Sequence, residues 1–104
     1  MRPLDDKIEL LKVIAHPTRI KILYELMEGV KCVSDFEKFL GKRQPNISQH
    51  LTLLRNHNIV DFYIDGKLRC YFLVEPMVPD ILQILEKQYE ETLPLPTCCP
   101  VSKR

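Results

Sequence analysis

Apolar residues recur every three to four positions through the first half of the chain, which is the repeat of an α-helix with one buried face. Pro17 and Pro45 stand where a helix can begin, because a first turn needs no backbone N–H donor there. Gly29 and Gly41 stand where a helix can end. The predicted helices cover residues 5–15, 17–28, 33–40 and 44–56. The last two are joined by a few residues including glycine, which is a helix-turn-helix pattern.

The same spacing indicates which side of each helix is buried. The expected inward residues are Ile20, Leu23, Tyr24 and Met27 in the second helix, Val33, Phe36 and Leu40 in the third, and Ile47, Leu51 and Leu54 in the fourth. Polar side chains of the fourth helix fall away from this stripe. They are therefore free to meet solvent or a ligand.

Residues 59–73 lose the helical repeat and are rich in β-branched and aromatic side chains, which predicts a β-hairpin. Two registers stay open. A two-residue turn at the Asp-Gly dipeptide 65–66, which that dipeptide favours, places Cys70 opposite Asp61. A three-residue loop places Cys70 opposite Phe62 instead and makes one face of the hairpin continuously apolar.

A last helix is expected over residues 78–92, with an apolar stripe wider than one small core needs. The stripe consists of Val78, Ile81, Leu82, Ile84, Leu85 and Tyr89. Such a stripe favours packing against a partner chain, with burial inside the same domain as the alternative. The proline-containing residues after it cannot continue a helix, so we expect one domain over 1–92 and a flexible tail over 93–104.

Length and composition narrow the class of protein. A chain of 104 residues makes one domain of marginal size, to which a dimer would add buried surface. It has no apolar run of ~20 residues and no signal-peptide core at the start, so we expect a cytoplasmic protein without a membrane partner. With three glycines, no phosphate-binding loop and no spacing of a catalytic triad, an enzyme is not expected.

Charge is distributed unevenly along the chain. Residues 38–70 contain six basic and two acidic side chains, whereas residues 76–92 contain one basic and four acidic ones. A basic middle fits a nucleic-acid surface, although ordinary solvated charge would fit the same count.

The predicted order α-α-α-α-β-β-α, mainly α with a β-hairpin, is that of a winged helix-turn-helix. Residues 11–23 (LKVIAHPTRIKIL), 32–35 (CVSD) and 44–55 (QPNISQHLTLLR), followed by the hairpin, make the likeness specific. In this order and spacing the chain resembles the ArsR/SmtB family of dimeric winged-helix repressors. The resemblance implies a homodimer that binds double-stranded operator DNA and represses transcription.

The polar side chains of the fourth helix and of the hairpin suit DNA. Gln and Asn can pair with adenine, Ser with several bases, and Arg or Lys with guanine or phosphate. The expected DNA-binding residues are Arg43, Gln44, Asn46, Ser48, Gln49, Arg55, Lys67 and Arg69. We expect His16 to cap a helix and His50 to serve packing or a backbone hydrogen bond, and neither to bind metal. A winged helix used only for protein contact is the alternative, and it would show no salt-sensitive duplex binding.

The resemblance also implies release from DNA by an inducer, often a metal ion or metalloid. A Cys-Val-Cys run used by some members is Cys32-Val33-Ser34 here, and the last helix lacks the histidines used by others. Adjacent Cys98 and Cys99 supply two soft donors, so a thiophilic ion such as As(III) is the expected inducer, with Cys32 as a possible third ligand. No cofactor is required. Redox sensing by the cysteine pair and regulation without any ligand stay open as alternatives.

Overall fold

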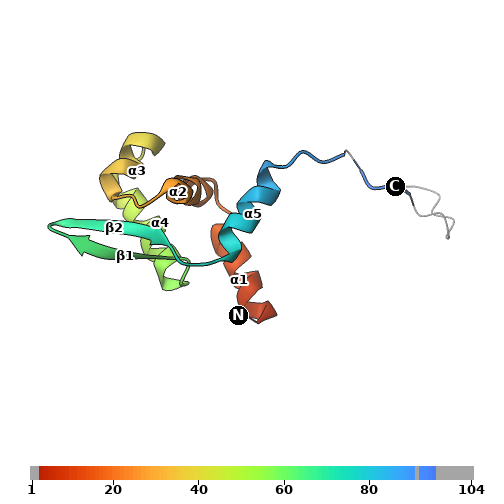
Figure 1. The fold of residues 1–104 in the computed structure, drawn as a ribbon, viewed down its shortest axis with the longest axis horizontal. Helices are drawn as coiled ribbons and strands as arrows, with labels where there is room; N and C mark the ends of the chain where they lie inside the picture. Colours follow the sequence, from red (N-terminus) through yellow and green to blue (C-terminus); the bar gives the residue numbers. More distant parts are fainter. Residues whose placement is uncertain (1–2, 91, 96–104) are drawn as a thin grey trace.

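The computed structural model describes residues 3–90 and 92–95. Within them the chain forms α1 (Leu4–Ile14), α2 (Pro17–Glu28), α3 (Val33–Leu40), α4 (Gln44–Asn56), β1 (Val60–Asp65), β2 (Leu68–Leu73) and α5 (Met77–Glu86). This order confirms the predicted winged helix-turn-helix. The hairpin lies beside α3 and α4 at one end of the fold, whereas α1 and α5 lie at the other (Figure 1). No helix in the described part of the chain is long and apolar enough to cross a membrane.

The core draws apolar side chains from all five helices and from the hairpin. Its members are Leu10, Val13, Ile14, Ile22, Leu23, Leu26, Phe36, Ile47, Leu51, Leu54, Ile59, Val60, Tyr71, Val78 and Leu82. The buried stripe predicted for α4 is confirmed. The one predicted for α2 is wrong in part, because α2 packs against α3, α4, α5 and β2 at once and buries Ile22 and Leu26. Met27 is 46% exposed as a result.

The hairpin adopts neither of the two registers expected from the sequence. Asp65 pairs with Leu68, so the two-residue turn is Gly66-Lys67, one position later than the Asp-Gly dipeptide suggests. Gly66 has φ 64°, whereas Lys67 has no positive φ, and glycine in the first central position is what a type II′ turn requires. In this register Phe62 lies opposite Tyr71, and the base of the hairpin packs on the core.

Helix α5 ends at Glu86, six residues before the expected end at Thr92. The backbone of Lys87 is extended, with ψ 148°. Glu86 and Glu90 bring negative charge to this end, where the helix dipole favours cations, so further turns are disfavoured. The wide apolar stripe is therefore split: Val78 and Leu82 are buried, whereas Ile84 and Leu85 are exposed.

Candidate nucleic-acid interface

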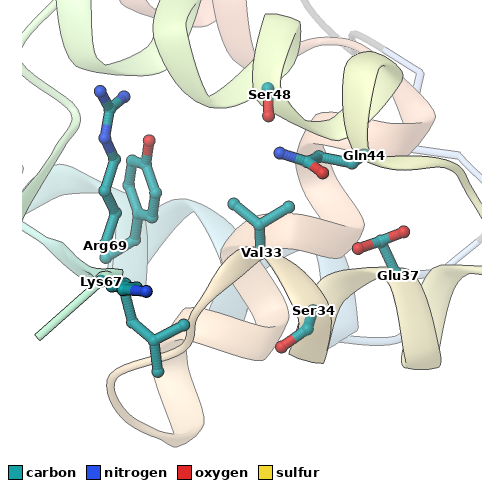
Figure 2. A pocket seen from close by; sticks show the side chains of 9 residues that line it. Val33, Ser34, Glu37, Gln44, Ser48, Lys67 and Arg69 are labelled. Atoms are coloured by element: carbon teal, nitrogen blue, oxygen red, sulfur yellow. The ribbon is translucent and has the colours of Figure 1, made fainter.

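A hollow of about 470 Å³ lies between α3, the first half of α4 and the hairpin. We call it the polar hollow, and its lining residues are Val33, Ser34, Glu37, Gln44, Ser48, Lys67, Leu68, Arg69 and Tyr71. Figure 2 shows Gln44 and Ser48 on α4, with Lys67 and Arg69 entering from the hairpin on another side. The fold thus brings together four of the residues that the sequence assigns to DNA, from segments about twenty positions apart.

The rotation of α4 follows from its buried stripe. Ile47, Leu51 and Leu54 are fully buried, which fixes the opposite side of the helix toward solvent. Gln44 and Ser48 are four positions apart and therefore lie one above the other on the same face. Because α4 begins at Gln44, the hollow also lies at the positive end of the helix dipole, which favours phosphate groups.

Three other predicted residues flank the polar hollow without lining it. Arg43 precedes α4 and is exposed, and Asn46 and Gln49 are exposed on its first turns. Their side chains are therefore available to a ligand that covers the start of α4.

The lining residues of the hollow carry two cations and one carboxylate. Lys67 lies in the hairpin turn, and the Arg69 guanidinium lies 4.8 Å from the centre of the Phe62 ring. Glu37 rises from α3 toward α4 (Figure 2). The sequence did not single out Glu37 or Ser34, although both follow from the helical repeat once α3 is known to face the hairpin.

Arg55 is separated from the polar hollow. Its Nε donates a hydrogen bond to Asp61 Oδ1 at 2.9 Å, and its guanidinium lies 4.5 Å from the centre of the Phe62 ring. This hydrogen bond is the largest of the causes that lower the pKa of the Asp61 carboxyl, followed by the bond from the Phe62 backbone N–H. No sequence signal pointed to Asp61, because its partner depends on how the hairpin is placed on α4.

Cys32, the candidate third metal ligand, precedes the first turn of α3. Its backbone N–H donates to Asp35 Oδ2 at 2.9 Å, and its Sγ lies 3.2 Å from the same oxygen. The backbone hydrogen bond is the largest of the causes that lower the pKa of Asp35. Cys98 and Cys99 lie outside the described residues. Among the residues that are described, no three His, Cys, Asp or Glu side chains gather as a metal site would require.

The two histidines near α2 form a polar link between helices. His16 caps α2 as expected, since its Nδ1 accepts the backbone N–H of Thr18. The His50 ring packs 4.7 Å from the His16 ring, and its Nδ1 accepts from Arg19 Nε at 3.1 Å rather than bonding the backbone. Arg19 also donates to Val13 O at 2.8 Å. Burial and, after it, the neighbouring charges lower the pKa of His50.

A second hollow, of about 390 Å³, lies at the other end of the fold between α1, the start of α2 and α5. We call it the apolar groove, and it is lined by Leu11, Ile14, Ala15, His16, Pro17, Ile20, Ile81 and Leu85. Leu4 and Ile8 of α1 and Ile84 of α5 add exposed apolar surface on the same two helices. This end of the molecule is therefore suited to burial against another apolar surface.

Comparisons with known proteins give a consistent picture. Residues 16–61 match the family model described as bacterial regulatory protein, arsR family. An uncharacterized HTH-type transcriptional regulator of Methanocaldococcus jannaschii is 33% identical over 84% of this chain and 99% of its own length. A cadmium resistance transcriptional regulatory protein CadC homolog of Staphylococcus aureus is 34% identical over 81% of this chain and 68% of its own. The structure of the transcriptional repressor BigR from Xylella fastidiosa superposes with a TM-score of 0.73 at 32% identity, covering 78% of this chain and 83% of that one.

Proposed function

Because this chain belongs to the arsR family of bacterial regulatory proteins, which are transcriptional regulators and not enzymes, we propose that it represses transcription by binding operator DNA. The observation that carries the proposal is the polar hollow. It joins two hydrogen-bonding side chains of α4, Gln44 and Ser48, to two cations of the hairpin, Lys67 and Arg69. Base edges need the first kind of group and phosphates the second.

In this mode the start of α4 enters the major groove, whose width of about 12 Å admits an α-helix. Gln44, Asn46, Ser48 and Gln49 then face base edges. Arg43 at the helix start and Lys67 and Arg69 of the hairpin contact the phosphates on either side. The hairpin is thereby the wing of the domain.

The active species in this proposal is a homodimer. The apolar groove and the exposed faces of α1 and α5 would otherwise leave a large apolar surface in water. A second copy of the chain covers this surface and presents a second α4 to the next major groove on the same side of the duplex, about 34 Å away.

Release from DNA is assigned to a thiophilic ion. Cys98 and Cys99 are its proposed ligands, with Cys32 as a possible third, and As(III) is the ion we expect. A relative named for cadmium resistance supports an inducer of this class. Binding favours a dimer geometry in which the two α4 helices no longer match successive grooves.

Fluorescence anisotropy on duplex DNA from the upstream region of the gene tests the proposal. Arg43, Lys67 and Arg69 from two protomers make about six phosphate contacts, so log K should fall with log salt at a slope of about −5. Binding that is independent of sequence, or absent, would contradict it. Light scattering on the same samples measures the oligomeric state.

Titration of the bound complex with As(III) tests the inducer. The double variant Cys98→Ser/Cys99→Ser should bind DNA as the wild type does and should no longer respond to the ion. Cys70→Ser is the matched control, because Cys70 lies in the hairpin opposite Tyr63. A retained response in the double variant rejects this site, and a response to peroxide in place of As(III) would favour redox sensing.

A further inference from the structure

Arg55 does not share the surroundings of the other residues predicted to bind DNA. It follows Gln44 by eleven positions, which is about 16 Å along the axis of α4. Gln44 lines the polar hollow, whereas Arg55 lines a smaller hollow at the far end of the helix. The smaller hollow is also lined by Asp61, at the start of the hairpin.

The contacts of Arg55 tie α4 to β1. Its Nε donates to Asp61 Oδ1 at 2.9 Å, and the same oxygen accepts the backbone N–H of Phe62 at 2.8 Å. The carboxylate is therefore oriented from two sides. The planar guanidinium of Arg55 also lies over the Phe62 ring, 4.5 Å from its centre, where a cation is attracted to the ring face.

The guanidinium of Arg69 also lies over the Phe62 ring. Arg69 pairs with Ile64 across the hairpin, so it lies diagonally from Phe62 on the same face of the two strands. Its guanidinium lies 4.8 Å from the ring centre, and its side chain lines the polar hollow. The Phe62 ring thus lies between the guanidinium of Arg55, near the end of α4, and that of Arg69, which lines the polar hollow.

The contacts of Asp61 and Phe62 lie where the hairpin passes from buried to exposed. Val60 and Tyr71 are buried and anchor the base of the hairpin, whereas residues 63–69 are all exposed. Two strands alone are marginally stable in water, so the exposed part needs a further support to keep one direction.

On the premise that the polar hollow binds DNA, we propose that Arg55, Asp61 and Phe62 form a clip that sets the angle of the hairpin against α4 and holds Arg69 toward the DNA. Arg55 is in this view a positioning residue and not a ligand of DNA. Asp61 supplies the carboxylate that holds the Arg55 side chain in the clip.

The substitution Asp61→Asn separates this proposal from a direct role of Arg55. If Arg55 contacts DNA, Asp61→Asn should strengthen binding, because it removes a negative charge next to Arg55 and weakens the competing bond to this arginine. An asparagine oxygen can still accept the Arg55 N–H but carries no charge. If the clip positions the hairpin, loss of the ion pair should therefore weaken binding by about two- to fivefold, the range of an exposed ion pair. The two models therefore predict opposite signs.

Asp65→Asn is the matched control. It removes the same charge from the same strand, but Asp65 pairs with Leu68 next to the turn and lies away from Arg55. Its affinity for DNA should equal or exceed that of the wild type. Thermal unfolding followed by circular dichroism verifies that both variants keep the fold.

Arg55→Lys supplies a second test that keeps the charge. A lysine can replace an arginine at a phosphate, but it lacks the planar group that both stacks on Phe62 and bonds Asp61. We expect Arg55→Lys to lose as much affinity as Arg55→Ala. In a double-mutant cycle, Arg55→Ala and Arg69→Ala should be non-additive, because both act through the same ring.

Wild-type affinity or better in Asp61→Asn, or in Arg55→Lys, would overturn the clip while leaving the DNA-binding function in place. Failure of the wild type to bind duplex DNA would instead overturn the proposed function, and the role of the clip with it.

Discussion

The polar hollow and the apolar groove lie at opposite ends of the fold and have similar volumes, about 470 and 390 Å³. Their linings are opposite in chemistry: one combines hydrogen-bonding groups and charges, the other consists almost wholly of aliphatic side chains. Association at the first exchanges counterions for lysine and arginine and must weaken with salt. Association at the second removes apolar surface from water and is not weakened by salt. Ionic strength therefore distinguishes the two ends in one sample.

The two ends are connected through a short polar link. His16 lines the apolar groove, and its ring lies 4.7 Å from the ring of His50 on α4. Arg19 bonds His50 and also the carbonyl of Val13, near the end of α1. These contacts join the lining of the apolar groove to α4, the helix that lines the polar hollow.

The largest expected effect comes from charging the apolar groove. Leu11→Glu/Leu85→Glu places carboxylates on two side chains that are 47% and 57% exposed, so the monomer fold should persist. The dimer should dissociate, and affinity for an operator with two half-sites should fall by about 100-fold or more, because the two α4 helices are no longer linked. Light scattering and anisotropy measure the two effects. Met27→Glu, an exposed apolar residue of α2, is the control, and equal loss in that variant would contradict the assignment.

A smaller effect is expected from removing the cations of the polar hollow. Lys67→Ala/Arg69→Ala deletes about four phosphate contacts per dimer, so the salt slope should flatten by about 3.6 and affinity should fall at least about tenfold at low salt. The dimer should be unaffected. As a control, Lys12→Ala/Lys21→Ala removes two cations from α1 and α2. It should change the salt slope by less than about 0.9, the value of one phosphate contact. An unchanged slope in the hairpin variant would exclude these residues from the DNA interface.

The smallest expected effect concerns the link between the ends. His50 has its pKa lowered from 6.5, first by burial and then by the charges of His16, Arg19 and Lys42. As the pH falls, the unfolded chain takes up this proton before the folded one. The stability that His50 confers is therefore complete above pH 6.5 and is lost as the pH falls below that value.

His50→Asn tests this dependence, because its side-chain carbonyl can accept the Arg19 N–H without titrating. The urea midpoint of this variant should change less between pH 7.5 and 5 than that of the wild type. A parallel pH dependence in the two proteins would assign it to other groups.

The sequence predicted α4 with its bounds and its buried stripe, because a helical repeat is local and a single core covers one side of it. It did not predict the hairpin register, since Gly66 belongs to both the Asp-Gly dipeptide and the observed Gly-Lys turn. The two registers differ by two positions and put the same side chains, Val60 and Tyr71 among them, on the core face, so the apolar pattern does not choose between them. The neighbours of Arg55 were also out of reach of the sequence, because its bond to Asp61 exists only in the folded arrangement of α4 and β1. Its assignment to DNA stays a prediction.

The proposed function gives Glu37 a consequence for the rate at which such a protein would search a genome. Its side chain lines the polar hollow together with Lys67 and Arg69 (Figure 2). If DNA binds there, a carboxylate repels the backbone of every sequence alike and should shorten the dwell time at wrong sites, which outnumber an operator by orders of magnitude. At an operator, contacts of Gln44 and Ser48 with the bases would offset this repulsion. A side chain that lowers affinity for all sequences would then hasten arrival at the one that is recognised.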